Sequence, residues 1–371
     1  MTPFTMFTIE FDKIPLDAFL ELPEELRSEA FFRVNELTNA YVDARARDVM
    51  VTMRSEALSP EAAGDVHPDR LAAWQWLVKK VARRADPSLI ANSPALRETI
   101  LAEFPSLAPA LDLIDVAARG YPEFLRGKRD GNSILFDPAF PTLWEEYFDN
   151  HNPLYAAGNT LASYAVEEAF ASRPPESQLN VFEVGAGCGS AALALLDRVA
   201  GRVGCYTLSD ISPGFLRKAR DGLSRHPAAA NIRFNYKLAD LNRPSGRWGV
   251  EAQSFDLVYA VNVLHAVRDL VETLRGLRSL LAEGGVLVMG ECVRPSRGHP
   301  VHPEFVFQLL EEFRSVVLDP ELRPESGFLD ARSWRASLHT AGFKRIRFVP
   351  DFEAAVAAYP EHSLVTLVAE G

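Results

Sequence analysis

The stretch Val181-Phe182-Glu183-Val184-Gly185-Ala186-Gly187-Cys188-Gly189 decides the fold of this chain. Its first part is typical of a buried strand, and Ser190 and the helix-forming run 191–199 follow the last glycine directly. A strand, a glycine turn and a helix in this order bring backbone N–H groups and a helix N-terminus close to a nucleotide-like cofactor. The segment therefore predicts a cofactor-binding loop.

The spacing of the glycines narrows the class of cofactor. Dinucleotide-binding loops follow the pattern G-x-G-x-x-G, whereas Gly185, Gly187 and Gly189 alternate behind Glu183. Ser190 stands where the third dinucleotide glycine would fall. An NAD-dependent dehydrogenase therefore stays only a weak alternative.

Two acidic residues follow the next two predicted strands. Strand 203–208 ends in Ser209-Asp210, and strand 232–238 ends in Ala239-Asp240-Leu241. At these positions Asp210 is expected to accept from ribose hydroxyls, and Asp240 from an adenine amino group while a backbone N–H faces the ring. Either aspartate alone could simply end a strand or cap a helix. Both together favour a nucleoside site.

The rest of the C-terminal part continues the alternation of strands and helices. Further strands are predicted at 255–260, 285–291, 343–349 and 363–368, and helices at 267–281, 304–316 and 331–341. Strands separated by helices indicate a parallel sheet covered on both faces, and the last two strands favour an antiparallel edge. The fold class is therefore α/β, with a seven-stranded Rossmann-like core.

The N-terminal part has a different pattern. Helical periodicity is clear at 71–85 and 94–104, and the one strand signal lies at 8–11. We therefore predict a mainly helical cap and substrate domain over residues 1–150, and a cofactor-binding core over residues 151–371.

Several of these motifs resemble those of a known family. The E-x-G-x-G-x-G pattern resembles the first motif of class I S-adenosylmethionine-dependent methyltransferases. A narrower likeness, from about residue 100 to the C-terminus, is to the methyltransferase domains of polyketide synthases. It rests on segments 125–128, 134–136, 155–159 and 206–212, on Asn262-Val263-Leu264-His265-Ala266 and on Met289-Gly290-Glu291.

This resemblance implies S-adenosyl-L-methionine as the cofactor and His265 with Glu291 as a catalytic dyad. Both residues follow central strands, at the rim where open α/β sheets place their ligands. A carboxylate beside an imidazole fixes its tautomer and makes it a general base, and no metal is implied. The residues expected to bind the cofactor are Tyr155, Asn159, Glu183, Gly185, Gly187, Gly189, Asp210, Ile211, Asp240, Leu241 and Asn262.

The implied activity is methyl transfer to a polyketide-like small molecule or acyl intermediate, with carbon favoured as the acceptor. O-methylation of a finished natural product is the alternative, and a non-catalytic cofactor-binding protein is a remote one. Segment 305–313 replaces the tryptophan-rich segment of the family, which changes the acceptor wall. His299 and His302 precede it and are interpreted as ordinary loop residues, with a role in substrate binding as the alternative.

Composition limits the partners of the chain. Its 371 residues carry a net charge of −11, which disfavours nucleic acid. The short basic cluster at 79–84 is interpreted as a solvated helix face, although it could dock a carrier protein. No targeting segment or membrane span is recognised, so a cytoplasmic protein is expected, and a homodimer stays open. The three cysteines suggest neither a disulfide framework nor a metal site.

Overall fold

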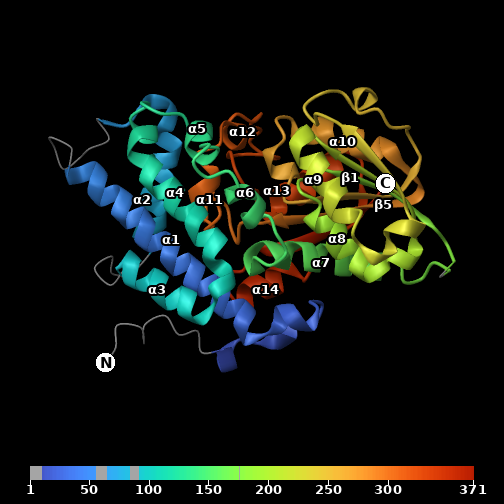
Figure 1. Cartoon of the computed structure of the whole chain (residues 1–371), viewed down its shortest axis with the longest axis horizontal. Coiled ribbons are helices and arrows are strands. Elements are labelled where there is room, and N and C mark those ends of the chain that lie inside the picture. The colour runs from blue at the N-terminus through green and yellow to red at the C-terminus, as the bar shows by residue number, and fades with distance from the viewer. Residues whose placement is uncertain (1–10, 56–64, 84–91, 175) are drawn as a thin grey trace.

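The computed structural model describes residues 11–55, 65–83, 92–174 and 176–371. In Figure 1 the N-terminal helices lie to the left and the sheet to the right, with α6 and α11 between them. Most of the strand expected at 8–11 lies outside the described residues, and Phe11 itself begins the short 3-10 helix Phe11–Lys13. Within the described parts of the chain, no helix is long and apolar enough to cross a membrane.

The region before the sheet is helical. Side chains of Asn92, Asp130 and Asn152 accept hydrogen bonds from backbone N–H groups in the first turns of α3, α5 and α7, which fixes where these helices begin. The long helices α1 and α4 were not predicted. The helices of this region are α1 (Glu29–Ser55), α2 (Leu71–Ala82), α3 (Ser93–Glu103), α4 (Ala108–Leu125), α5 (Gly131–Leu135), α6 (Leu143–Tyr147) and α7 (Pro153–Ala169).

The sheet has seven strands in the order β3-β2-β1-β4-β5-β7-β6. Strands β1 to β5 are parallel, and β7 runs antiparallel to both β5 and β6. This confirms the seven-stranded Rossmann-like fold with an antiparallel edge. The strands are β1 (Leu179–Val184), β2 (Val203–Asp210), β3 (Arg233–Leu238), β4 (Phe255–Val261), β5 (Leu281–Cys292), β6 (Lys344–Val349) and β7 (Leu364–Glu370).

Helices cover both faces of the sheet. One apolar cluster joins α7, α8 (Ser190–Val199) and α9 (Pro213–Leu223) to one face. Another joins α10 (Leu270–Leu280), α13 (Ala331–Thr340) and α14 (Phe352–Ala358) to the other. Because β1 lies between β2 and β4, the strand order reverses here, and a crevice is expected beyond the carboxyl ends of these strands.

Two predicted elements differ from the structure. The helix expected at 304–316 is two short helices, α11 (Glu304–Phe307) and α12 (Glu311–Arg314). The chain leaves the helical conformation between them, and Phe305, Phe307 and Phe313 are all buried in the core of the N-terminal helices. The short helix α14 between β6 and β7 was also missed. The segment after β5 thus completes the core of the helical region.

Candidate active site

The glycine loop after β1 has the backbone that its sequence requires. Gly185, Gly187 and Gly189 have φ values of 61°, 53° and 87°, in the left-handed region that favours glycine. A Cβ at position 185 would lie 2.5 Å from a methyl group of Val263, so the loop packs tightly there. A Cβ at position 187 would meet nothing within 4 Å. The loop therefore has one packed side, at 185, and one open side, at 187.

Asp210 at the end of β2 is tied to this loop. Its Oδ2 accepts from the N–H of Gly187 at 2.9 Å, and its Oδ1 accepts from the N–H of Ser212 at 2.7 Å. Burial raises the pKa of the carboxyl group although these hydrogen bonds lower it. Ile211, the next residue, is 66% exposed. A carboxylate with fixed geometry and an uncovered apolar side chain thus lie side by side.

Asp240 and Leu241 follow β3, which pairs with β2 and so lies beside the strand that ends in Asp210. The N–H of Ala239 donates to the carbonyl of Asp210 at 3.0 Å, which joins the ends of β2 and β3. The Asp240 carboxylate is partly exposed and accepts from the N–H of Asn242 at 2.9 Å. Leu241 packs partly buried against the sheet core.

Glu183 is placed differently from the aspartates, because its side chain is buried within β1 and points toward β2. Its Oε2 accepts from the hydroxyl of Tyr206 at 2.8 Å. Burial raises the pKa of Glu183 to about 8, against the lowering effect of this hydrogen bond. Glu183 therefore supports the strand under the loop, and its carboxyl group lies in the sheet.

Helix α7 contributes Tyr155 and Asn159. The Asn159 Nδ2 donates to Oδ1 of Asn150 at 2.7 Å, and Asn150 in turn donates to the carbonyl of Ser190 at the start of α8 at 2.8 Å. The Asn159 Oδ1 is buried without a hydrogen-bond partner among the described residues. Asn150 was not predicted, and it links α7 to the glycine loop. Tyr155 packs against Phe148, with ring centroids 5.0 Å apart.

His265 and Glu291 form a close buried pair. The Nδ1 of His265 lies 2.7 Å from Oε2 of Glu291, and the two residues are 4% and 2% exposed. Oε1 of Glu291 accepts from the N–H groups of Leu264 and Val263 at 2.8 and 3.3 Å. Because Glu291 accepts from Nδ1–H, the lone pair of the ring lies on Nε2. The Nε2 atom has no hydrogen-bond partner in the described chain.

The surroundings of His265 include residues that sequence reasoning missed. The guanidinium of Arg323, which is 2% exposed, donates to the carbonyls of His265 and Val267. Burial lowers the pKa of Arg323 to about 10. The rings of Phe307, Phe313 and Phe328 lie around the imidazole, with the Phe328 centroid at 4.5 Å. Segment 305–313 does form an aromatic wall, and Arg323 holds the turn that carries the histidine.

A cavity of about 90 Å³ joins several of these residues. Glu291 lines it, as do Tyr155 and Asn262, whose backbone is left-handed at φ 58° and whose N–H donates to Gly290 at 2.7 Å. The opposite wall comes from α1 and from the loop after β5, through Phe31, Asn35, His302 and Phe307. His265 is not part of the lining and is connected to the cavity through Glu291. The helical region and the sheet therefore share one cavity.

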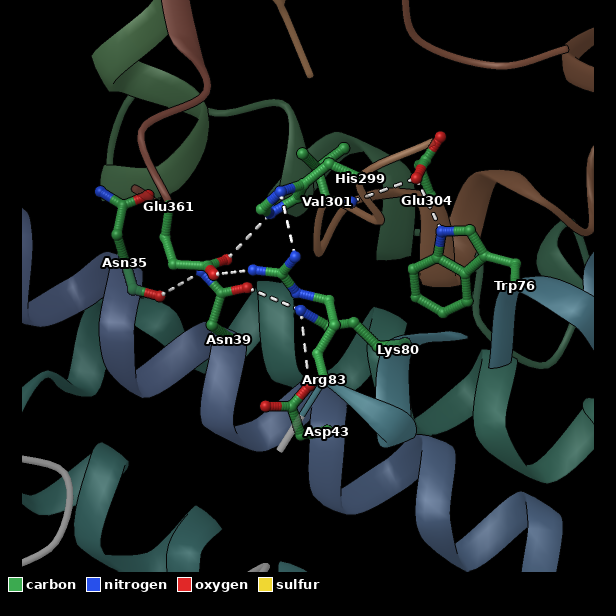
Figure 2. A network of polar contacts seen from close by, with 10 residues as sticks. All are labelled: Asn35, Asn39, Asp43, Trp76, Lys80, Arg83, His299, Val301, Glu304 and Glu361. Carbon is green, nitrogen blue, oxygen red and sulfur yellow. Dashed lines mark hydrogen bonds and ion pairs between the residues drawn. The ribbon is translucent and has the colours of Figure 1, made fainter. Parts of the chain in front are cut away.

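The basic cluster at 79–84 was predicted to be a solvated helix face, but not all of it is exposed. Lys80 is 3% exposed, and its Nζ donates to Oδ1 of Asn39 at 2.9 Å and lies 3.4 Å from Oδ1 of Asp43 (Figure 2). The interpretation as a solvated helix face is therefore wrong for Lys80, because two side chains of α1 pair with its charge. Arg84 lies outside the described residues.

Known proteins show matching sequences and folds. A family model described as a methyltransferase domain matches residues 182–287. The non-reducing polyketide synthase dpmpA of Macrophomina phaseolina (strain MS6) is 32% identical over 266 residues, which are 70% of this chain. The chain spans only 12% of the length of that relative.

Solved structures match over nearly the whole chain. The CurJ carbon methyltransferase has a TM-score of 0.70 at 22% identity, over 95% of each chain. The trans-methyltransferase CalH, solved in complex with SAH, has a TM-score of 0.68 at 19% identity, over 96% of this chain and 94% of that one. The likeness in fold therefore includes the helical region as well as the sheet.

Proposed function

This chain is a class I S-adenosylmethionine-dependent methyltransferase that resembles the methyltransferase domains of polyketide synthases, and from that premise we propose that it methylates carbon. The acceptor would be the acidic carbon between two carbonyl groups of a polyketide-like acyl compound, with His265 as the base. The observation that carries this proposal is the buried contact of 2.7 Å between His265 and Glu291, of which Glu291 lines the cavity.

The residues around the glycine loop fit the cofactor. The open side at Gly187 leaves room for a ligand, and the Oδ1 of Asn159, which has no partner within the described part of the chain, offers it a hydrogen-bond acceptor. S-adenosylmethionine supplies an electrophilic methyl group when bound. Asp210 and Asp240 would hold the ribose and adenine, Ile211 and Leu241 would flank the ring, and Tyr155 and Asn262 would contact the methionine end. Glu183, Gly185 and Gly189 would support the loop.

His265 can act as a base because its environment fixes one tautomer. Glu291 holds Nδ1–H, so Nε2 keeps the lone pair that would take a proton from the acceptor carbon. Because His265 does not itself line the cavity, the acceptor would have to reach Nε2 past Phe307, which lines the cavity and packs against the imidazole. Two backbone N–H groups keep the Glu291 carboxylate in place, and Arg323 keeps the turn of His265 in place. The three phenylalanine rings around the imidazole reduce competition from water. CurJ, with a similar fold, is described as a carbon methyltransferase.

We also infer that residues 1–150 act as a cap and substrate domain over the core of residues 151–371. The shared lining of the cavity supports this, since Phe31 and Asn35 of α1 line the same cavity as Glu291 and Asn262. Segment 301–313 would belong to the cap functionally, because its buried phenylalanines pack into the helical core. The cap would then select the acceptor, whether it is a diffusible compound or an acyl group on a carrier.

The test uses the whole chain, deuteromethyl-labelled S-adenosylmethionine and the acetoacetyl thioester of N-acetylcysteamine. We expect one labelled methyl group on carbon 2, detected by mass spectrometry and NMR. His265→Ala and Glu291→Gln should each lower kcat by about 10²–10⁴, the usual contribution of a general base. Calorimetry should show unchanged binding of S-adenosylhomocysteine by both variants.

The position of the label decides between the two acceptor atoms. A label on oxygen would contradict carbon methylation and support O-methylation of hydroxylated acceptors. A wild-type protein that binds the cofactor product but methylates no acetoacetyl thioester, free or carrier-bound, would contradict the proposed acceptor class.

A further inference from the structure

His302 is a histidine in the cavity wall that the proposed mechanism has not used. It lies on the turn between β5 and α11 and lines the cavity together with Glu291 and Asn262. Neither of its ring nitrogens has a hydrogen-bond partner in the described parts of the chain. His302 is partly buried, so its ring can meet water or a ligand that enters the cavity. A ligand in the cavity could therefore bond to this ring.

The turn that carries His302 is anchored on its N-terminal side. The guanidinium of Arg83 donates to Nδ1 of His299 at 3.2 Å, so Nε2 of His299 carries the proton and faces Glu361 at 3.5 Å (Figure 2). Arg83 also pairs with Glu361 directly at 2.6 Å. The end of α2, this turn and the segment before β7 are thereby tied together, and both nitrogens of His299 are occupied.

The turn is anchored on its C-terminal side as well. Oε2 of Glu304 accepts from the indole N–H of Trp76 at 2.6 Å and from the N–H of Val301 at 3.1 Å (Figure 2). The guanidinium of Arg294 donates to Oε1 of the same carboxylate. Glu304 is completely buried. His302 therefore lies between two fixed points, which position the backbone of the turn.

The charge state of His302 suits a donor to a developing negative charge. Burial lowers its pKa to about 3, and the cation of Lys80 adds to this effect, while Glu361 opposes it. The imidazole is therefore neutral near pH 7 and keeps one N–H donor and one acceptor. A neutral imidazole can polarise a carbonyl without itself losing a proton.

We propose that His302 binds the carbonyl oxygen of the acyl acceptor and stabilises the enolate that forms from it. This inference rests on the proposed carbon methylation. The C–H bond of the acceptor breaks, its proton passes to Nε2 of His265, and the electron pair delocalises onto the carbonyl oxygen. That oxygen then accepts a hydrogen bond from the ring N–H of His302.

Other polar groups of the cavity are less suited to this role. The side-chain amide of Asn35 already donates to the carbonyl of Phe31 at 2.9 Å. Tyr155 and Asn262 are assigned to the cofactor end. The hydroxyl of Ser363 bonds to the thiol of Cys292. Tyr147 is the remaining hydroxyl donor without a partner among the described residues of the lining, so it is the rival that the test must include.

The test measures two rates with the acetoacetyl thioester of N-acetylcysteamine. One is exchange of the carbon-2 protons in deuterated water with S-adenosylhomocysteine bound, and the other is methyl transfer. His302→Phe should lower both by roughly 10²–10³, as loss of one oxyanion donor does elsewhere. His302→Gln, which restores a donor, should recover part of the loss. Binding of S-adenosylhomocysteine and the thermal midpoint should show that the variants are folded.

His362→Phe is the matched control. His362 is another buried imidazole whose pKa burial lowers, to about 4, but it packs against Phe19 and Phe352 outside the cavity lining. Its replacement should leave both rates unchanged. Unchanged rates in His302→Phe, or a loss found only in Tyr147→Phe, would overturn the role of His302 alone. A wild-type protein with neither exchange nor transfer would overturn the proposed function and this inference together.

Discussion

The two ends of the proposed active site are built in different ways. At the cofactor end the decisive contacts join neighbouring βα units, such as Gly187 to Asp210, 23 residues apart. At the acceptor end they join distant segments, such as Trp76 to Glu304, 228 residues apart, and Arg83 to Glu361, 278 residues apart. The first end depends on backbone conformation, and the second on side chains that only tertiary folding brings together. A constant ligand suits the first, and a variable acceptor suits the second.

Two histidine–glutamate pairs show the same difference. His265 and Glu291 are 2.7 Å apart, and the second ring nitrogen is unpartnered within the described residues. His299 and Glu361 are 3.5 Å apart, and Arg83 occupies the other ring nitrogen. Only the first pair leaves a ring nitrogen without a partner among the described residues, as the proposed base requires. The second pair can position a turn, so a His–Glu pair by itself does not identify a base.

Among the substitutions that test this comparison, Gly185→Ala is expected to have the largest effect on stability and on cofactor binding. The new Cβ would meet Val263 at 2.5 Å, and φ is 61°. Positive φ strain and overpacking together should lower the free energy of unfolding by about 4 kcal/mol and abolish measurable cofactor binding. Urea unfolding and titration with S-adenosylhomocysteine measure both.

Gly187→Ala is the control for this prediction, because a Cβ there meets nothing within 4 Å. Gly187→Ala should lower the free energy of unfolding only through backbone strain, by about 1–2 kcal/mol. It should still weaken binding of S-adenosylhomocysteine, because the new methyl group fills the open side of the loop. Equal losses of stability in the two variants would show that contact with Val263 is unimportant.

Much of the cofactor end could be predicted from the sequence. The alternation of strands and helices predicted the sheet. The residues that follow β1, β2 and β3 predicted the positions of the glycine loop, Asp210 and Asp240. His265 and Glu291 were found through resemblance, and the structure brings them together. Arg323 and Asn150 were missed, because each acts through a partner far away in the chain and leaves no periodic signal. Phe31 and Asn35, the residues of α1 that line the cavity, were missed as well.

Glu183→Gln is expected to have a smaller effect, which should appear as a change in how the free energy of unfolding depends on pH. The folded-state pKa of about 8 lies above the ordinary value of 4.5, so the folded state binds the proton more tightly than the unfolded state. The wild-type contribution to stability is therefore present at low pH and is lost as pH rises toward 8. The variant lacks this loss, so its stability relative to wild type should rise by about 1.4 kcal/mol per pH unit between pH 5 and 7.

Urea unfolding at pH 5, 6 and 7 measures this slope, and a stability difference independent of pH would contradict it.

Asp210→Asn provides the comparison for cofactor binding. Asp210 contacts the loop directly, so its variant should lose far more affinity for S-adenosylhomocysteine than Glu183→Gln, which can keep the hydrogen bond from Tyr206. Equal losses would place Glu183 in direct contact with the cofactor.

The smallest effect is expected from Arg83→Ala, which removes one anchor of the turn that carries His302. The pair with Glu361 is partly exposed, so its loss should cost no more than about 1 kcal/mol of stability. A loosened turn should raise KM for the acceptor about two- to fivefold and leave cofactor binding unchanged. Arg33→Ala is matched, because Arg33 pairs with Glu103 at 3.2 Å with similar exposure, away from the cavity lining. If both variants raise KM equally, the acceptor end depends on the general stability of the cap and the anchored turn has no special role.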